Sequence, residues 1–220
     1  MTSDVGILVA IEGIDGAGKN TLVSALESAL DARGLSSARR AFPRYGTHHA
    51  DLAAGALRGR LGPVSGSPEA MALLFALDRQ AATPDLLAAK GEVDVLLCDR
   101  YVASNAAYSA ARLGERSFSD VIGWIEAMEH EEMGVPRADG YILLPTPVTE
   151  ARRRADARAA DDASRELDAY ETDARLQADT AAAYERLAQT EWTAPWWRAE
   201  LGVPPEDAAA MLADRIAALA

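Results

Sequence analysis

The sequence has a single cysteine, Cys98, among its 220 residues. An intrachain disulfide is therefore impossible, and a lone thiol fits a reducing compartment. Long hydrophobic runs are also missing, since none approaches the roughly 20 apolar residues that a membrane-spanning helix needs. The first residues lack the basic stretch that opens a secretory signal peptide. We therefore expect a soluble cytoplasmic protein with no membrane partner.

Positive charge is scarce. Lysine and arginine number 22 against 34 aspartate and glutamate residues, which gives a formal net charge of -12. An acidic surface repels a phosphate backbone, so we expect no nucleic-acid partner. A small phosphorylated ligand is not excluded, because local basic groups can form a positive pocket on a negative molecule. Hydrophobic residues make up 49% of the chain and charged residues 25%, which is typical of a globular protein.

Short apolar runs alternate with longer segments of helical periodicity, and no repeat or linker divides them. The runs predict strands over residues 6–11, 37–42, 93–98, 140–144 and 196–200. Helices are expected over residues 19–33, 50–60, 69–80, a further segment after Pro84, 104–113, 118–133, 148–158, 170–189 and 205–219, with a loop at 62–68. This alternation predicts an α/β fold, with a parallel sheet of about five strands, helices on both faces and one domain over residues 1–220.

A glycine-rich loop lies between the first expected strand and the first expected helix. Its spacing, Gly-x-x-x-x-Gly-Lys, is that of a phosphate-binding loop, in which backbone N–H groups and a helix N-terminus surround phosphate oxygens. The alternative is an ordinary glycine-rich turn, which the strand–helix context disfavours. The residues predicted to bind ATP are Gly13, Ile14, Asp15, Gly16, Ala17, Gly18, Lys19, Asn20 and Thr21.

The loop departs from its usual pattern at Asn20, where Ser or Thr normally supplies a hydroxyl to Mg²⁺. An amide oxygen is a poorer ligand, so a bound Mg²⁺ would depend more on carboxylates, with Asp15 and Asp99 as candidates. Asp99 and Arg100 follow the expected strand at 93–98, at the edge of the sheet where α/β proteins bind ligands. An acidic residue there can hold Mg²⁺, and the arginine can bind a phosphate. The alternative is a helix cap with a surface ion pair.

Five segments in the same order resemble those of the thymidylate kinases, most closely the actinobacterial branch. They are the phosphate loop and the stretches Phe42-Pro43-Arg44-Tyr45, Leu74-Phe75-Ala76-Leu77-Asp78-Arg79, Asp99-Arg100-Tyr101-Val102-Ala103-Ser104-Asn105-Ala106-Ala107-Tyr108 and Asp168-Ala169-Tyr170-Glu171. The resemblance covers most of the chain. It implies a P-loop kinase fold and the transfer of the γ-phosphoryl group of ATP to dTMP, giving dTDP and ADP.

The resemblance also implies roles for individual residues. Phe75 would stack on thymine, Arg79 would bind the base O4 and Asn105 would support N3. Tyr108 would exclude a ribose 2′-hydroxyl. By itself, Phe75 on a helix reads more simply as a core residue. The dTMP-binding residues implied are Phe42, Pro43, Arg44, Tyr45, Phe75, Arg79, Arg100, Ser104, Asn105, Tyr108 and Tyr170.

Residues 152–171 resemble the family's lid. Because Gly16 replaces an arginine that some members carry in the phosphate loop, the resemblance implies that lid arginines supply the positive charge. One expected lid arginine aligns with Asp161, and a solvated helix face is the alternative reading of this stretch. The catalytic residues implied are Asp15, Lys19, Arg100, Arg154, Arg158 and Arg165, and Glu171 joins Asp15 and Asp99 as a Mg²⁺ candidate.

Two other functions stay open at this point. One is a different nucleoside-monophosphate or deoxynucleoside kinase, which the base-reading pair Arg79 and Asn105 argues against. The other is a regulatory nucleotide-binding module, which Asn20 keeps open because weak Mg²⁺ binding favours binding over turnover. Family members are homodimers, and the helices expected at 69–80 and 118–133 are candidates for the interface.

Overall fold

The structure is a computed structural model that describes residues 6–114, 116–161 and 169–220, with the backbone alone over residues 158–161. Its five strands are β1 (Ile7–Glu12), β2 (Ser37–Ala41), β3 (Val95–Asp99), β4 (Gly140–Leu143) and β5 (Trp196–Arg198). They form one sheet in the order β2-β3-β1-β4-β5. Every neighbouring pair is parallel, which confirms the predicted sheet.

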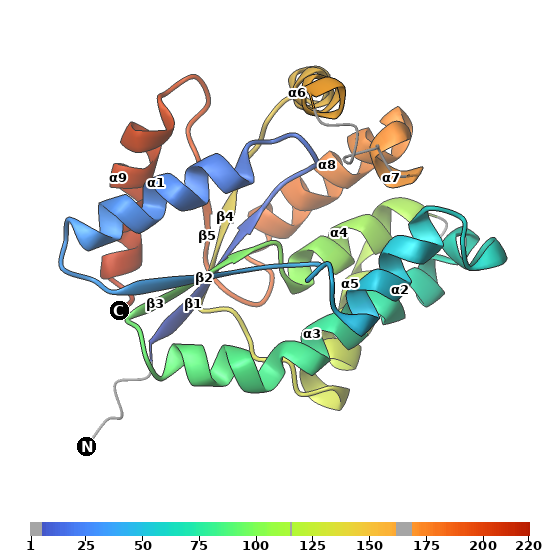
Figure 1. Ribbon diagram of the computed structural model, residues 1–220, viewed down its shortest axis with the longest axis horizontal. Coiled ribbons are helices and arrows are strands. Elements are labelled where there is room, and N and C mark those ends of the chain that lie inside the picture. The colour runs from blue at the N-terminus through green and yellow to red at the C-terminus, as the bar shows by residue number, and fades with distance from the viewer. Residues whose placement is uncertain (1–5, 115, 162–168) are drawn as a thin grey trace.

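Helices cover both faces of this sheet (Figure 1). On one face, α1 (Lys19–Asp31) packs beside α9 (Pro205–Ala217). The other face carries α3 (Pro68–Lys90), α4 (Val102–Arg112), α5 (Phe118–Glu126) and α8 (Ala174–Gln189), and α2 (His48–Leu57) packs on α3. The helices α6 (Val148–Asp161) and α7 (Ala169–Thr172) lie near α8, at the end of the sheet where the strands finish.

The two central strands are buried on both faces. Leu8 to Ile11 of β1 and Val95 to Cys98 of β3 have no exposed surface, which explains why both read as unbroken apolar runs. Their register pairs Ile11 with Asp99. The phosphate loop and the Asp99-Arg100 segment therefore leave the sheet side by side.

Three helix predictions need correction. The break expected at Pro84 is wrong, because α3 runs unbroken through it. Pro84 and Gln80 are both exposed, so water can bond the Gln80 carbonyl that the missing N–H leaves free. The helix expected over residues 118–133 is α-helical only to Glu126 and continues as a π-helix, η2 (Ala127–Glu132).

The helix expected over residues 170–189 is divided into α7 and α8. Asp173 lies between them in extended conformation, and its carboxylate accepts from the backbone N–H groups of Arg175 and Leu176, so it caps α8. The loop expected at 62–68 contains a 3₁₀ turn, η1 (Gly62–Gly66). None of the described helices is long and apolar enough to cross a bilayer.

Candidate active site

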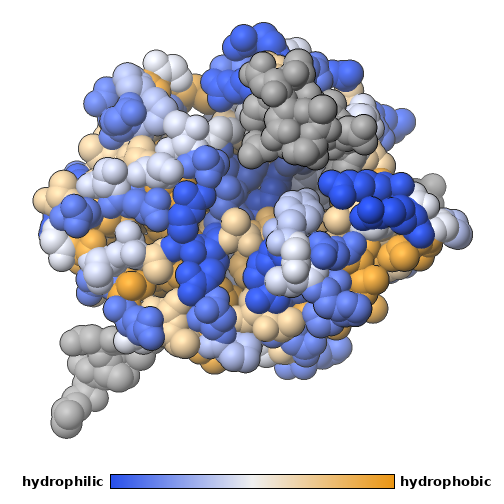
Figure 2. All heavy atoms as spheres, viewed as in Figure 1, coloured by the Kyte–Doolittle hydropathy of each residue, from blue (hydrophilic) through white to orange (hydrophobic). Residues whose placement is uncertain are grey.

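Two adjoining cavities open where β1 and β3 end. The helical cavity lies between α3 and α4 and is lined by Met71, Phe75, Arg79, Asn105, Tyr108 and Tyr170 among others. The loop cavity is lined by residues 15–22 together with Asp99, Arg154, Glu171 and the segment 199–203. Five residues line both: Asp15, Phe42, Pro43, Tyr45 and Arg100. Figure 2 shows this face hollowed near its middle, with hydrophilic residues around the hollow.

The phosphate loop has the backbone that its glycines allow. Gly13, Gly16 and Gly18 have φ values of 148°, 80° and 103°, which other residues rarely adopt. The loop ends directly in α1, whose first turn borders the loop cavity. A helix N-terminus in this position favours an anion.

The Lys19 ammonium lies inside the loop. Its Nζ donates to the carbonyl oxygens of Gly13 and Ile14, at 3.1 and 3.0 Å. Burial, and then the positive charge of Arg100, lowers the pKa of Lys19 to about 8. Nearby carboxylates only partly offset this shift, and a phosphate in the loop cavity would add further negative charge beside the ammonium.

Asp15 and Arg100 form the ion pair shared by the two cavities. Arg100 Nη2 lies 2.5 Å from Asp15 Oδ1, and Tyr108 donates its hydroxyl to Asp15 Oδ2 at 2.7 Å. Burial alone would raise the pKa of Asp15, but the charges of Arg100 and Lys19 outweigh it and hold that pKa well below its usual range. Asp15 is therefore an anion throughout the physiological pH range.

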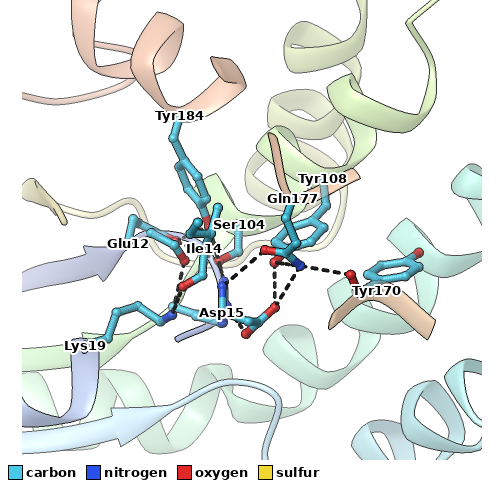
Figure 3. Close-up of polar contacts among 11 residues, drawn as sticks. Glu12, Ile14, Asp15, Lys19, Ser104, Tyr108, Tyr170, Gln177 and Tyr184 are labelled. Atoms are coloured by element: carbon cyan, nitrogen blue, oxygen red, sulfur yellow. Dashed lines mark hydrogen bonds and ion pairs between the residues drawn. The ribbon is translucent and has the colours of Figure 1, made fainter. Parts of the chain in front are cut away.

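Gln177 of α8 connects Asp15 to the helical cavity, as Figure 3 shows. Its Nε2 donates to Asp15 Oδ2 and the Tyr108 hydroxyl, both at 3.4 Å, and to the Tyr170 carbonyl at 2.9 Å. The rings of Tyr108 and Tyr170 stack with centroids 5.6 Å apart. The sequence analysis missed Gln177, because a single amide on a helix carries no motif.

A buried carboxylate, that of Glu12, positions Arg100 indirectly, through the groups around it. The backbone of Arg100 is left-handed, with φ 65°, and the next N–H, that of Tyr101, donates to Glu12 Oε1 at 2.8 Å. Ser104 and Tyr184 donate to Glu12 Oε2 at 2.6 and 2.9 Å. Arg100 Nη1 donates to the same two hydroxyl oxygens, at 3.2 and 3.4 Å. Burial raises the pKa of Glu12, and these hydrogen bonds oppose that shift.

The predicted base-reading residues lie together at the inner end of the helical cavity. Arg79 is 3% exposed and Asn105 is 4% exposed, and both contact Glu129 of η2. Phe75 is partly buried, lines the cavity and packs on the apolar cluster that includes Tyr170. Phe75 is therefore a partly buried residue of the cavity wall, and its stacking on thymine stays a prediction.

Two predicted site residues are engaged elsewhere. Arg44 does not line either cavity, because its Nε pairs with the buried Asp78 at 2.9 Å and its backbone N–H donates to the same carboxylate. Asn20 is exposed, and its amide oxygen accepts from Arg39 Nη2 at 2.6 Å. Asn20 still borders the loop cavity, but its oxygen points toward Arg39 in this arrangement.

The carboxylates predicted to bind Mg²⁺ line one cavity but do not form a cluster. Asp15, Asp99 and Glu171 all border the loop cavity. Among the residues that the structure describes, no three His, Cys, Asp or Glu side chains lie close enough together to hold a metal ion. Mg²⁺ usually takes one or two carboxylates, several waters and substrate phosphates, and the Asp99 carboxylate, which has no partner in the described chain, fits that requirement.

The lid arginines are only partly described. Arg154 of α6 donates to the Ala17 carbonyl of the phosphate loop at 3.1 Å and also pairs with Glu150. Arg158 lies in α6, where the structure gives only the backbone, as it does for Asp161. Arg165 lies outside the described residues.

Similar proteins of known family show which family the chain resembles. A family model described as thymidylate kinase matches residues 11–194. The chain is 46% identical to the thymidylate kinase of Mycobacterium tuberculosis over 208 residues, which cover 94% of this chain and 97% of that protein. It is 36% identical over 157 residues to the thymidylate kinase of Xanthomonas euvesicatoria pv. vesicatoria, covering 69% of this chain and 63% of the relative.

A solved structure of thymidylate kinase from Candida albicans has the same fold. It superposes with a TM-score of 0.72 and covers 97% of this chain and 92% of its own, at 20% sequence identity. The nearly full-length match at 46% identity and the family model both confirm the resemblance that the five segments carry. The chain belongs to the thymidylate kinase family.

Proposed function

We propose that the chain carries out the reaction of a thymidylate kinase with dTMP in the helical cavity and ATP along the loop cavity. A phosphate oxygen of dTMP attacks the γ-phosphorus of ATP, the bond to the β,γ-bridging oxygen breaks, and dTDP and ADP result. The observation that carries this assignment is that the two cavities meet at Asp15 and Arg100. A phosphoryl group could cross there without leaving the site.

The acceptor needs no strong base, because its phosphate is already anionic. Catalysis then depends on positioning and on neutralising charge at the migrating group. Arg100, fixed by Asp15 and by the Glu12 network, would hold the acceptor phosphate. Lys19 and the phosphate loop would hold the donor phosphates, and Arg154 and Arg158 of α6, with Arg165, would add positive charge from the lid.

Inside the helical cavity, Phe75 would stack on thymine, with Arg79 at O4 and Asn105 at N3. The stacked rings of Tyr108 and Tyr170 would form the wall of the cavity next to the sugar. Mg²⁺ would be held by Asp99, with Asp15 and Glu171 nearby, and would neutralise charge on the phosphates of ATP.

The protein as a whole would be a cytoplasmic enzyme with one domain, a lid over residues 152–171 and a homodimeric assembly. Large apolar side chains on α3 support the dimer, since Leu73 is 43% exposed and Leu87 is 56% exposed. Scattered apolar residues are ordinary on a surface, but two on one helix can form the centre of an interface.

Phosphoryl transfer is measured by giving the purified protein ATP, Mg²⁺ and one monophosphate at a time, and following ADP release. We expect dTMP to give the highest kcat/KM among dTMP, dCMP, dAMP and dGMP. Lys19→Met should abolish the reaction. Lys90→Met is the matched control and should retain it, because Lys90 pairs with Asp139 away from both cavities.

The proposal fails if dTMP releases no more ADP than water does. Nucleotide binding without turnover of any monophosphate would instead favour the regulatory module. Preferred turnover of a different monophosphate would favour another nucleoside-monophosphate kinase.

A further inference from the structure

A buried carboxylate, Glu129, lies behind the base-reading end of the helical cavity. It has no exposed surface, whereas Glu131 and Glu132 of the same π-helix are exposed. The wide turn continues to Val135, whose backbone N–H donates to the Glu129 carbonyl at 2.9 Å. π-Turns occur often at functional sites, and a buried carboxylate is costly unless it is paired.

The two oxygens of Glu129 receive three hydrogen bonds from the base-reading pair. Arg79 donates from Nε to Oε2 at 2.5 Å and from Nη2 to Oε1 at 2.7 Å. Asn105 donates from Nδ2 to Oε1 at 2.7 Å. Burial opposes the charge on Arg79, but the carboxylate outweighs it and raises the pKa of Arg79 above its usual value.

These bonds leave one defined hydrogen-bonding group on each residue. Nη1 of Arg79 has no partner among the described residues, so it remains a donor. Both hydrogens of Asn105 Nδ2 are used, on Glu129 and on the Ala72 carbonyl at 3.0 Å. Asn105 Oδ1 has only a long contact of 3.4 Å from Ser109 Oγ, so it remains an acceptor.

A donor beside an acceptor is the complement of the thymine edge, which presents the O4 acceptor next to the N3–H donor. Cytosine presents the reverse, an N4 amino donor next to an N3 acceptor. With cytosine in the site, the Arg79 donor would face the N4 donor and the Asn105 acceptor would face the N3 acceptor. Such a mismatch disfavours binding strongly, because buried polar groups are left unpaired.

We propose that Glu129 is the positioning residue that sets this donor–acceptor order and thereby excludes cytosine nucleotides. The inference rests on the proposed function, because it takes the helical cavity as the dTMP site. Glu129 itself does not touch the base. It acts by accepting one hydrogen of the Asn105 amide, beside the Ala72 carbonyl that accepts the other, and by holding the Arg79 guanidinium in one orientation.

The test compares wild type with Glu129→Gln, in steady-state kinetics with dTMP and with dCMP. A glutamine at position 129 has one acceptor oxygen in place of two, so it cannot accept all three hydrogen bonds from Arg79 and Asn105, and it no longer fixes the orientation of either side chain. We expect the ratio of kcat/KM for dTMP to kcat/KM for dCMP to fall about 10- to 100-fold. The loss should lie mainly in the KM for dTMP, with the KM for ATP unchanged.

A matched control separates positioning from folding. Glu131→Gln makes the same change at an exposed position of the same π-helix, and it should leave the ratio unchanged.

A fall in the ratio for Glu129→Gln, with the ratio for Glu131→Gln unchanged, supports the proposal. A lower melting temperature with an unchanged ratio would overturn it, because Glu129 would then be only structural. Should Glu129→Gln not fold, Glu129→Asp keeps the charge but shortens the side chain, and it must lower the same ratio relative to wild type. A wild type without preference for dTMP over dCMP would instead defeat the proposed function itself.

Discussion

At the scale of single residues, burial disfavours two neighbouring charges of the phosphate loop, but the net pKa shift favours the charge of only one of them. Asp15 has Arg100 and Lys19 beside it, and these charges hold its pKa below the usual range in spite of burial. Lys19 lies near Asp15 but also near Arg100, and burial dominates, so its pKa is lowered to about 8. The Asp15 carboxylate therefore stays charged at every working pH, whereas the Lys19 ammonium loses its proton as the pH rises through about 8.

Lys19 should make ATP use sensitive to alkaline pH. Below pH 8 the ammonium is charged and attracts the triphosphate, and above its pKa of about 8 the neutral amine does not. We expect kcat/KM for ATP to fall as pH rises through about 8, approaching a tenfold loss per pH unit, since this parameter reports groups of the free enzyme. The measurement is the pH profile of kcat/KM for ATP at dTMP concentrations well below its KM, so that ATP meets the enzyme without bound dTMP.

Lys19→Arg is the control for that profile. A guanidinium does not lose its proton in this range, so the variant should be slower but flat between pH 7 and about 9.5. A flat wild-type profile, or the same fall in Lys19→Arg, would contradict the assignment.

At the scale of elements, the phosphate loop and α6 depend on each other. A Cβ atom built on Gly16 would lie 2.0 Å from the Ala151 carbonyl oxygen of α6, and the φ of Gly16 is +80°. Arg154 of the same helix reaches the Ala17 carbonyl. An arginine at position 16 would collide with α6 in its present position. The close approach of α6 to the phosphate loop therefore requires glycine at position 16.

Gly16→Ala should therefore damage ATP use and stability together. The left-handed backbone alone costs about 1 kcal/mol for alanine, and the contact with Ala151 should add about 1–3 kcal/mol or displace α6. We expect a lower free energy of unfolding in urea and a lower kcat/KM for ATP.

Gly34→Ala is the matched control, because Gly34 has φ +76° and no atom within 4 Å of the added Cβ. It should show the backbone cost of about 1 kcal/mol in the urea measurement and unchanged kinetics. Equal effects of the two variants would mean that the contact between Gly16 and α6 is unimportant.

At the scale of the whole molecule, α3 links the helical cavity to the outer surface. One side of the helix carries Met71, Phe75 and Arg79 into the cavity, and the other exposes Leu73 and Leu87. A dimer built on the exposed side would brace the helix that reads the base.

Leu73→Asp combined with Leu87→Asp should convert the proposed dimer to monomers. Two buried charges at an interface centre would cost several kcal/mol, which is enough to shift a dimer at micromolar concentration. The measurement is the molar mass by light scattering during size-exclusion chromatography. Met211→Asp on α9, where the side chain is 48% exposed on the other face, should leave the mass unchanged. A monomeric wild type would disprove the assembly.

The sequence by itself determined the sheet, the phosphate loop and the family. Those depend on local patterns: apolar runs at β1 and β3, glycines at fixed spacing before Lys19, and short segments around Arg79 and Arg100. The helix boundaries predicted from the sequence were wrong at Pro84 and at Glu126. The exposure of the Gln80 carbonyl and the burial of Glu129 depend on tertiary packing, which local sequence patterns do not encode.

Only the tertiary structure decided which side chains hold the site in place. Glu12, Glu129, Gln177 and Tyr184 carry no motif, and each meets its partners from a distant part of the chain. Arg44 matched a family segment, yet in the fold Asp78 takes its side chain. Spacing in sequence predicts the groups that touch phosphate, whereas buried charges find their partners only when the elements pack, because burial makes pairing necessary.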